Sequence, residues 1–313
     1  MKIILTITAM HIGMLLFLNA SLAQPGPDLK DANNTVQNEI TGNIQSKTIV
    51  FITGSFVSNA CWDEWRTYFE SKGFTTLAPP WPGKDADAAT LRARHPDTAL
   101  AAVGLNDVIE SYTKIIKALP EKPILIGHSF GGAISQILLN RGLAAACVAI
   151  HTAPPKGVLP YEFRFIRSTY KALGLFTSLN KTYLISFKKF QNVFVNGLPL
   201  EDQKQAYEAF AIPESKRATR DGLTRVAYVD FKKEHAPLLI LAGTEDKLIP
   251  AHLCKRVFRK YESKTSITEF VLKERNHFVL GLPTWKEDAE YILNWINNLA
   301  IPKSGFDSTT KTN

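Results

Sequence analysis

The sequence has few cysteines. Only Cys61, Cys147 and Cys254 occur among its 313 residues, and they form neither a C-x-x-C pair nor a cluster with histidine. An odd, scattered set of this kind excludes a disulfide framework and does not indicate a metal site. The stability of the fold must therefore come from a hydrophobic core, which a chain of this length with 45% hydrophobic residues can build.

Runs of basic residues and long apolar segments are also scarce. The formal net charge is +8, but no run of lysine and arginine and no nucleic-acid motif accompanies it. We therefore expect a solvated basic surface and no nucleic-acid partner. After residue 23 no apolar stretch is long enough to span a bilayer, and no internal repeat is visible.

The first 23 residues have the pattern of a secretory signal peptide. Lys2 precedes an apolar run over residues 3–18, and small residues follow at 19–23. We predict a signal peptide at 1–23, cleavage near Ala23, and export to the periplasm or the extracellular space, with no membrane span afterwards. An uncleaved membrane anchor is the alternative, for which the apolar run is short.

Further along, short apolar strands alternate with amphipathic helices. Strands are predicted at 48–52, 74–78, 124–126, 145–150, 237–242 and 267–272, with helices between most of them. Continuously apolar strands indicate a parallel sheet that is buried on both faces. We therefore predict an α/β domain at 47–300 with a mostly parallel sheet of about six strands. A flexible linker is expected at 24–46 and a flexible tail at 301–313.

The alternation stops at about residues 154–233. This segment contains no apolar strand, has helical character and is rich in aromatic residues such as Tyr161, Phe163 and Phe176. An insertion of this length between two strands predicts a helical lid with an apolar underside. Helical packing without any role in substrate binding is the alternative.

The most informative stretch is 123–142. Gly127, Ser129 and Gly131 fit the G-x-S-x-G nucleophile elbow, between a predicted strand and a predicted helix. The elbow holds its serine at the apex of a sharp, strained turn and exposes the hydroxyl. The two glycines stand where strand and helix approach too closely for a Cβ atom. The pattern therefore nominates Ser129 as a nucleophile.

A serine nucleophile needs two partners. An imidazole must take its proton, and a carboxylate must hold that imidazole in the right tautomer. Ligands of parallel α/β sheets bind beyond the carboxyl ends of the strands, and Asp246 and His277 each follow such an end. Their order after Ser129 is that of the α/β-hydrolase arrangement, so we predict a catalytic triad of Ser129, Asp246 and His277.

Neighbouring residues compete for these two roles. Glu245 adjoins Asp246, but successive side chains diverge and the G-x-x-D spacing favours Asp246. His128 is fixed inside the elbow and points away from the hydroxyl of Ser129. His151 ends a strand without a matching acid, in a position to line a pocket.

An oxyanion hole requires two backbone N–H donors aimed where negative charge develops. We assign one to Phe130, the residue after the nucleophile. The other is assigned to Ser55, in the turn after the first strand.

With these residues in view, the chain resembles the α/β-hydrolase superfamily, in the lid-bearing group of small esterases, lipases and related enzymes. The elbow at 127–132, the segment 243–246 and His277 carry a resemblance that spans residues 47–299. It implies a three-layer fold without the two leading antiparallel strands of longer members. One departure is Thr53, followed by Gly54, where many members have His-Gly.

The resulting hypothesis is a serine hydrolase that cleaves a carboxylic ester of an apolar small molecule through an acyl-enzyme, with no cofactor and no metal. The same triad also suits amides, thioesters or C–C bonds. A non-catalytic protein that binds small molecules on the same fold is the alternative from another class, and the intact triad argues against it. The substrate and the oligomeric state are not specified by these motifs.

Overall fold

The computed structural model describes residues 44–261 and 266–300. Their strands form one sheet in the order β2-β1-β3-β4-β5-β6, and every neighbouring pair is parallel. The predicted α/β fold and its parallel sheet are confirmed. The strands are β1 (Thr48–Ile52), β2 (Thr75–Leu77), β3 (Ile124–His128), β4 (Ala146–Ile150), β5 (Leu238–Gly243) and β6 (Thr268–Lys273).

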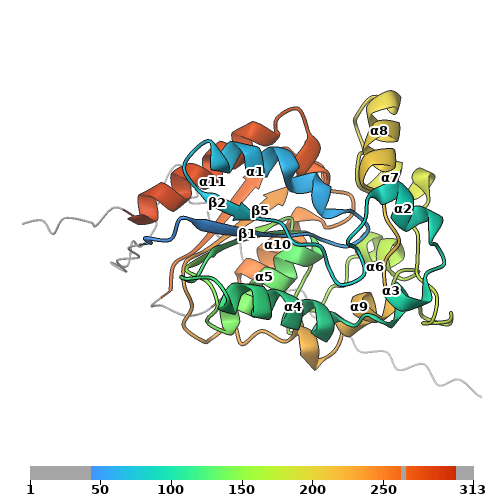
Figure 1. Cartoon of the computed structure of the whole chain (residues 1–313), viewed down its shortest axis with the longest axis horizontal. Helices are drawn as coiled ribbons and strands as arrows, with labels where there is room; N and C mark the ends of the chain where they lie inside the picture. Colours follow the sequence, from blue (N-terminus) through green and yellow to red (C-terminus); the bar gives the residue numbers. More distant parts are fainter. Residues whose placement is uncertain (1–43, 262–265, 301–313) are drawn as a thin grey trace, which may run out of the picture. The chain divides into compact units, whose positions relative to one another are not determined.

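Helices cover both faces of this sheet, which gives the three layers (Figure 1). One face carries α1 (Asp63–Glu70) and α11 (Trp285–Ala300). The other carries α4 (Leu105–Lys117), α5 (Phe130–Asn140) and α10 (Ala251–Phe258). The short 3-10 helices η1 (Asn59–Trp62) and η3 (Val279–Gly281) lie beside α1 and α11 in the fold.

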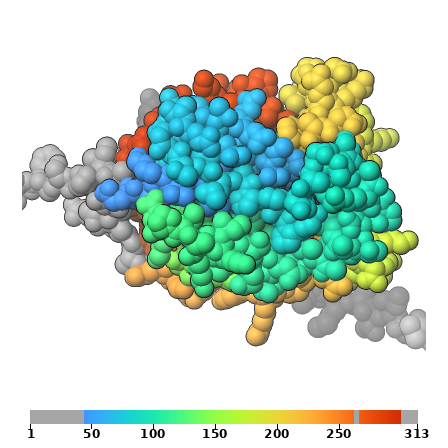
Figure 2. Space-filling model, in the orientation of Figure 1, coloured from blue at the N-terminus to red at the C-terminus, as the bar shows by residue number. Residues whose placement is uncertain are grey.

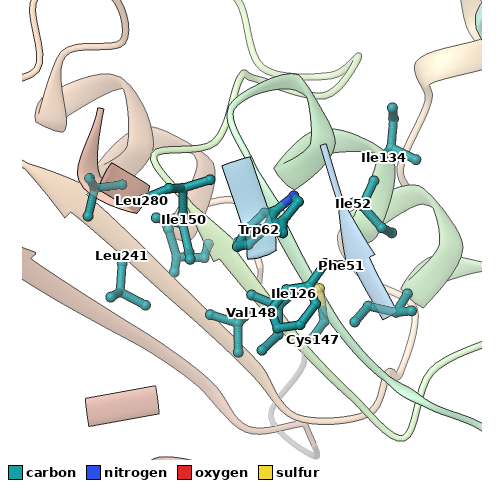
Figure 3. Packing of buried hydrophobic residues seen from close by; sticks show 14 of the residues in the cluster. Phe51, Ile52, Trp62, Ile126, Ile134, Cys147, Val148, Ile150, Leu241 and Leu280 are labelled. Carbon is teal, nitrogen blue, oxygen red and sulfur yellow. The ribbon is translucent and has the colours of Figure 1, made fainter. Parts of the chain in front are cut away.

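Burial explains why the central strands are apolar throughout. Every residue of β1, β3, β4 and β5 is buried, because each of these strands has a neighbour on both sides and helices on both faces. Figure 3 shows the resulting core, in which Phe51 of β1 stacks on Trp62 with ring centroids 4.7 Å apart. The edge strands β2 and β6 are less buried.

Between β2 and α4 lie two short helices that the apolar pattern of the sequence does not predict. These are α2 (Ala88–Ala93) and α3 (Thr98–Ala102). Asp87 and Asp97 cap them, since their side chains accept hydrogen bonds from backbone N–H groups three residues later. Helices of five or six residues are too short to display an apolar period, so the pattern missed them.

Residues 154–233, which we call the inserted segment, connect β4 to β5 and contain no strand. Their helices are α6 (Phe163–Thr169), α7 (Phe187–Val193), α8 (Leu200–Phe210), α9 (Lys216–Asp221) and the 3-10 helix η2 (Arg225–Ala227). The predicted helical character of this segment is therefore confirmed. In Figure 1, α6, α7 and α8 lie beyond the carboxyl ends of the strands together with α2 and α3, and Figure 2 shows α8 standing out in yellow.

The predicted signal peptide, the linker up to residue 43 and the tail lie outside the described residues. At the end of the predicted linker, Ile44 and Ser46 are buried, and the Ser46 hydroxyl donates to Glu121 at 3.0 Å. None of the helices in the described part of the chain is both long and apolar enough to cross a membrane.

Candidate active site

Ser129 occupies the turn between β3 and α5, at the carboxyl edge of the sheet. Its φ of 58° and ψ of −122° are a strained combination for a residue with a side chain. Hydrogen bonds hold it there. The Ser129 N–H donates to the carbonyl of Ile150, and the Ser129 carbonyl accepts from Gly132 and Ala153.

The glycines on either side allow strand and helix to approach. A Cβ atom on Gly127 would lie 2.3 Å from the carbonyl oxygen of Gly131, and one on Gly131 would lie 2.1 Å from the carbonyl oxygen of Ile52. Both distances are far inside van der Waals contact. The strand–turn–helix context that the elbow pattern requires is therefore present around Ser129.

Three side chains from different strand ends meet at this turn. The Nε2 atom of His277 lies 3.0 Å from Oγ of Ser129, and its Nδ1 atom lies 2.7 Å from Oδ2 of Asp246. All three residues are buried. Because a carboxylate only accepts, Nδ1 of His277 carries the hydrogen and Nε2 is free to accept the serine proton. This is the geometry of a nucleophile, a base and an orienting acid.

Asp246 is held as an anion. Its Oδ1 atom accepts from the backbone N–H groups of Leu248 and Ile249, at 2.8 and 2.7 Å. Burial by itself would raise the pKa of the Asp246 carboxyl, but the charge of His277 and hydrogen bonds from both His277 and His151 hold it well below its usual value. The adjacent Glu245 is exposed, as its diverging side chain predicted.

His151 also binds this acid, which the sequence did not indicate. Its Nδ1 atom lies 2.9 Å from the same Oδ2 atom of Asp246 that His277 contacts. The interpretation of His151 as a histidine without a matching acid is therefore wrong. The two residues are 95 positions apart, and only the pairing of β4 with β5 brings their strand ends together.

His128 completes a group of three buried histidines. Its Nε2 atom lies 2.9 Å from the backbone carbonyl oxygen of His277, so it contacts that residue's main chain rather than the Ser129 hydroxyl. Burial, followed by the charges of His277 and His151, lowers the pKa of His128 well below its ordinary value. His128 is therefore neutral, and it supports the loop that carries His277.

The same three histidines could be taken for metal ligands, since one ring nitrogen of each lies within 4.8 Å of the others. Hydrogen bonds argue for a different assignment. Both ring nitrogens of His277 are engaged, with Asp246 and Ser129, and His151 uses Nδ1 on the same carboxylate. An ion would have to displace these bonds, so we assign the group to the hydrogen-bond network.

Ser55 follows β1 and Phe130 begins α5, and both residues line the cavity that Ser129 also lines. Phe130 is the first residue of α5, and the N–H of a first helical residue has no partner within its helix. Thr53 lies in the turn after β1. Its carbonyl accepts from Trp81 Nε1 at 3.1 Å and its hydroxyl from Trp62 Nε1 at 3.2 Å, which fixes this turn.

A buried ion pair supports the turn after β1, and sequence reasoning missed it. Glu214 of the inserted segment accepts from the backbone N–H of Phe56 at 3.1 Å and from Lys84 Nζ at 2.7 Å. Phe56 directly follows Ser55 and has a φ of 73°. Lys84 and Glu214 are 130 positions apart and leave no local signal, so the pair could not be identified from the sequence.

A mostly apolar cavity of about 390 Å³ opens beside Ser129. Its walls come from the elbow, the turn after β1, the loop after β5 and the inserted segment. They include Phe56, Val158, Phe165, Leu173, Leu223 and Ile249. The inserted segment also covers the histidine, because the Phe194 ring packs edge-on against His277 with centroids 4.7 Å apart.

A parallel sheet of this order, with a strained serine elbow at its carboxyl edge, is typical of α/β hydrolases. Comparison of the sequence with protein families agrees with this classification. Residues 49–288 match the alpha/beta hydrolase family, and the chain belongs to it. A search of curated proteins finds no significant match.

Solved structures show the same fold at low sequence identity. An extracellular alpha/beta-hydrolase from a Paenibacillus species is 22% identical with a TM-score of 0.60, over 79% of this chain and 98% of that one. The monoacylglycerol lipase of Paleococcus ferrophilus is 21% identical with a TM-score of 0.59, over 80% and 94%. A variant of methylketone synthase I from tomato is 17% identical with a TM-score of 0.61, over 81% and 99%.

Proposed function

We propose that this hydrolase is a serine esterase that cleaves carboxylic esters of apolar small molecules through an acyl-enzyme. One observation carries the proposal: Ser129 Oγ lies 3.0 Å from Nε2 of a histidine whose Nδ1 is held by a buried carboxylate. Such an arrangement activates a hydroxyl that is otherwise a poor nucleophile at neutral pH.

The first half of the reaction forms the acyl-enzyme. Oγ of Ser129 attacks the ester carbonyl carbon while Nε2 of His277 takes the hydroxyl proton. The negative charge that develops on the carbonyl oxygen is stabilised by the backbone N–H groups of Ser55 and Phe130. The bond from carbon to the alcohol oxygen then breaks, and His277 returns the proton to the departing alcohol.

The second half repeats these steps with water. His277 takes a proton from water, the resulting hydroxide attacks the acyl carbon, and the bond to Ser129 Oγ breaks as the proton returns to it. The carboxylic acid then leaves. Asp246 stays ionised throughout, because the charge of His277 and the hydrogen bonds from His151 and His277 hold its pKa low, and it stabilises the imidazolium form of His277 in both halves.

The cavity supports the substrate class. Its walls are mostly apolar, so binding comes from buried apolar area, and few polar groups are present to recognise a charged substrate. We propose that the inserted segment acts as a lid, since it supplies Phe165 and Leu173 to these walls and Phe194 to the surroundings of His277. Export is proposed as well, on the N-terminal sequence pattern.

Replacement of the nucleophile tests the proposal. With p-nitrophenyl butyrate as the substrate, Ser129→Ala should lower kcat by at least about 10⁴-fold, because the attacking atom is removed. Ser58→Ala is a matched control, since Ser58 is also buried and its hydroxyl has no hydrogen-bond partner among the described residues. Equal rates for wild type and Ser129→Ala would contradict the proposal.

Two further measurements separate the alternatives. A fluorophosphonate probe should label wild type but not Ser129→Ala, whereas a binding protein with an inactive triad would remain unlabelled. An ester, an amide and a thioester with the same acyl group should show the highest kcat/KM for the ester. A clear preference for the amide or thioester would assign the same residues to that chemistry.

A further inference from the structure

The inserted segment carries an excess of positive charge. Residues 156–200 contain seven lysines and arginines but only one acidic residue, Glu162. That carboxylate is buried and pairs with Arg256, so it does not offset the exposed cations. The net charge of +8 is therefore concentrated here rather than spread evenly over the surface.

Five of these basic side chains, together with Lys247 from the loop after β5, line one groove of about 690 Å³, which we call the basic groove. No acidic residue lines it, and within the described residues none of the six pairs with a carboxylate. Burial and the neighbouring charge of Lys171 lower the pKa of Lys189. The six residues are Arg164, Arg167, Lys171, Lys188, Lys189 and Lys247. Like charges gathered in this way indicate an anionic ligand.

Large apolar side chains are exposed on the same stretch of chain, which we call the apolar ridge. No residue of α6 is buried, Phe163 is 73% exposed and Phe176 is fully exposed. Among the described residues, most of the exposed large hydrophobic side chains lie here. The ridge consists of Leu159, Tyr161, Phe163, Ile166, Tyr170, Leu175 and Phe176. Exposure of this extent marks an interaction site.

The beginning of the ridge is held in place by α10. The Arg256 guanidinium lies 3.7 Å from the centroid of the Tyr161 ring and donates to the carbonyl of Leu159 at 3.0 Å. It also binds the carboxylate of Glu162. These contacts fix the backbone of 159–162 while the side chains of Leu159 and Tyr161 stay largely exposed.

Helix α6 connects the two features to the candidate active site. Arg164 and Arg167 face the basic groove, whereas Phe165 and Ile166 line the cavity beside Ser129. The ridge residue Leu159 lines that cavity as well. One short helix therefore forms a wall of the cavity, a wall of the basic groove and part of the apolar ridge.

We propose that this face docks on an anionic lipid surface, with the basic groove against the headgroups and the apolar ridge in the acyl boundary. Basic residues and exposed aromatic or aliphatic side chains on one face are the combination that binds such surfaces. A soluble polyanion would suit the groove but would leave the ridge without a function. Docking also defines a substrate class, namely esters that reside in the lipid phase. This second conclusion rests on the proposed function.

Binding is tested apart from catalysis. The full chain carrying Ser129→Ala is sedimented with phosphatidylcholine vesicles, with or without phosphatidylglycerol. We expect at least about tenfold stronger binding when phosphatidylglycerol is present, decreasing as salt is added. Since no turnover is needed, the result stands whether or not Ser129 proves to be a nucleophile. Equal binding to both kinds of vesicle, or none, would overturn the proposal.

Charge reversal locates the binding face. The combined substitutions Arg164→Glu, Arg167→Glu and Lys171→Glu should weaken binding by at least about tenfold. The control changes three exposed lysines by the same amount of charge near the end of α4, next to the amino end of β3, through Lys114→Glu, Lys117→Glu and Lys122→Glu. It should change binding by less than about threefold. An equal loss in both variants would mean attraction by net charge alone, which contradicts a docking face.

Two exposed aromatic residues test the ridge. Phe163→Ser with Phe176→Ser should weaken vesicle binding about tenfold, because apolar side chains no longer enter the acyl boundary. Leu200→Ser with Leu272→Ser is the control, as both leucines are exposed outside the ridge. Unchanged binding in the first variant would assign the groove to soluble anions and overturn lipid docking. Thermal unfolding of each variant, compared with wild type, tests whether the replaced side chains alter the fold.

Discussion

Asp246 accepts hydrogen bonds from two histidines through a single oxygen atom. With the backbone donors of Leu248 and Ile249, its carboxylate has four donors. Each donor stabilises the negative charge and makes the carboxylate less basic. We therefore expect His151 to act through Asp246 as a positioning residue, limiting how strongly the carboxylate stabilises a proton on His277.

Replacing His151 should change the pH dependence of the reaction. In His151→Leu the carboxylate loses one donor, becomes more basic and stabilises the imidazolium more strongly. We expect the acid limb of kcat/KM to move to higher pH by up to about one unit, with little change in KM. The measurement is a pH profile with one soluble ester.

His151→Asn is the matched control for that profile. Asparagine has an amide donor and tolerates the positive φ of 46° at this position. The acid limb should return toward that of wild type. If the Leu and Asn variants have the same profile as wild type, His151 has no influence on the acid.

At the scale of elements, the inserted segment is bonded to the turn after β1. The backbone N–H of Ile212 donates to the carbonyl of Phe56 and that of Ser58 donates to Phe210. The same turn is bonded to the buried pair of Glu214 and Lys84, since Glu214 accepts from the N–H of Phe56, and Lys84 Nζ lies 3.9 Å from the centroid of the Trp81 ring. Burial lowers the pKa of Lys84, although the charge of Glu214 opposes that shift. The turn that carries Ser55 is thus supported from the inserted segment.

Breaking this pair should destabilise the protein. Lys84→Met leaves a buried carboxylate without its counter-charge, so we expect the free energy of unfolding to fall by about 3–5 kcal/mol. Adding Glu214→Gln removes that charge and retains an acceptor for the N–H of Phe56. The double variant should therefore be more stable than the single one. Urea titrations measure both differences.

An exposed pair is the control for the buried one. Lys204 and Glu201 lie on α8 with side chains more than half exposed. Lys204→Met should change the unfolding free energy by no more than about 1 kcal/mol. If the buried and exposed pairs cost the same, or if the two changes at 84 and 214 simply add, the buried pair does not support the turn.

At the scale of the whole domain, the sheet order places the site. From β1 the chain moves to one edge of the sheet through β2, and from β3 it moves to the other edge. The crevice where this direction reverses lies between the carboxyl ends of β1 and β3, which is the general position of ligand sites in such sheets. Ser55 and Ser129 follow these two strands.

Global stability should decrease in mild acid because of His128. Folding lowers the pKa of this buried histidine, so below the ordinary imidazole value of about 6.5 the unfolded chain binds a proton that the folded domain does not. Stability is then lost as the pH falls through that value, by at most about 1.4 kcal/mol per pH unit.

His128→Gln isolates this contribution. Glutamine can donate to the carbonyl of His277 but does not titrate. Urea midpoints between neutral and mildly acidic pH should therefore fall less steeply for the variant than for wild type. Parallel pH dependences would show that His128 does not differ between the folded and unfolded states.

The sequence by itself determined the parts that depend on nearby residues. The apolar strands, the serine elbow and the place of Asp246 and His277 at strand ends are encoded within a few positions each, because strand burial and turn strain act locally. The parallel α/β fold followed from these patterns. Capped helices of one or two turns escaped prediction, since an apolar period needs more residues than they have.

Only the tertiary structure decided which distant residues meet. The second histidine on Asp246, the ion pair of Glu214 with Lys84, and the joint exposure of basic and apolar side chains along α6 all depend on how remote segments pack. The pairs are 95 and 130 positions apart, and nothing in the local sequence marks either partner. Strand order and the path of the inserted segment bring them together, and both are set by the packing of the whole domain.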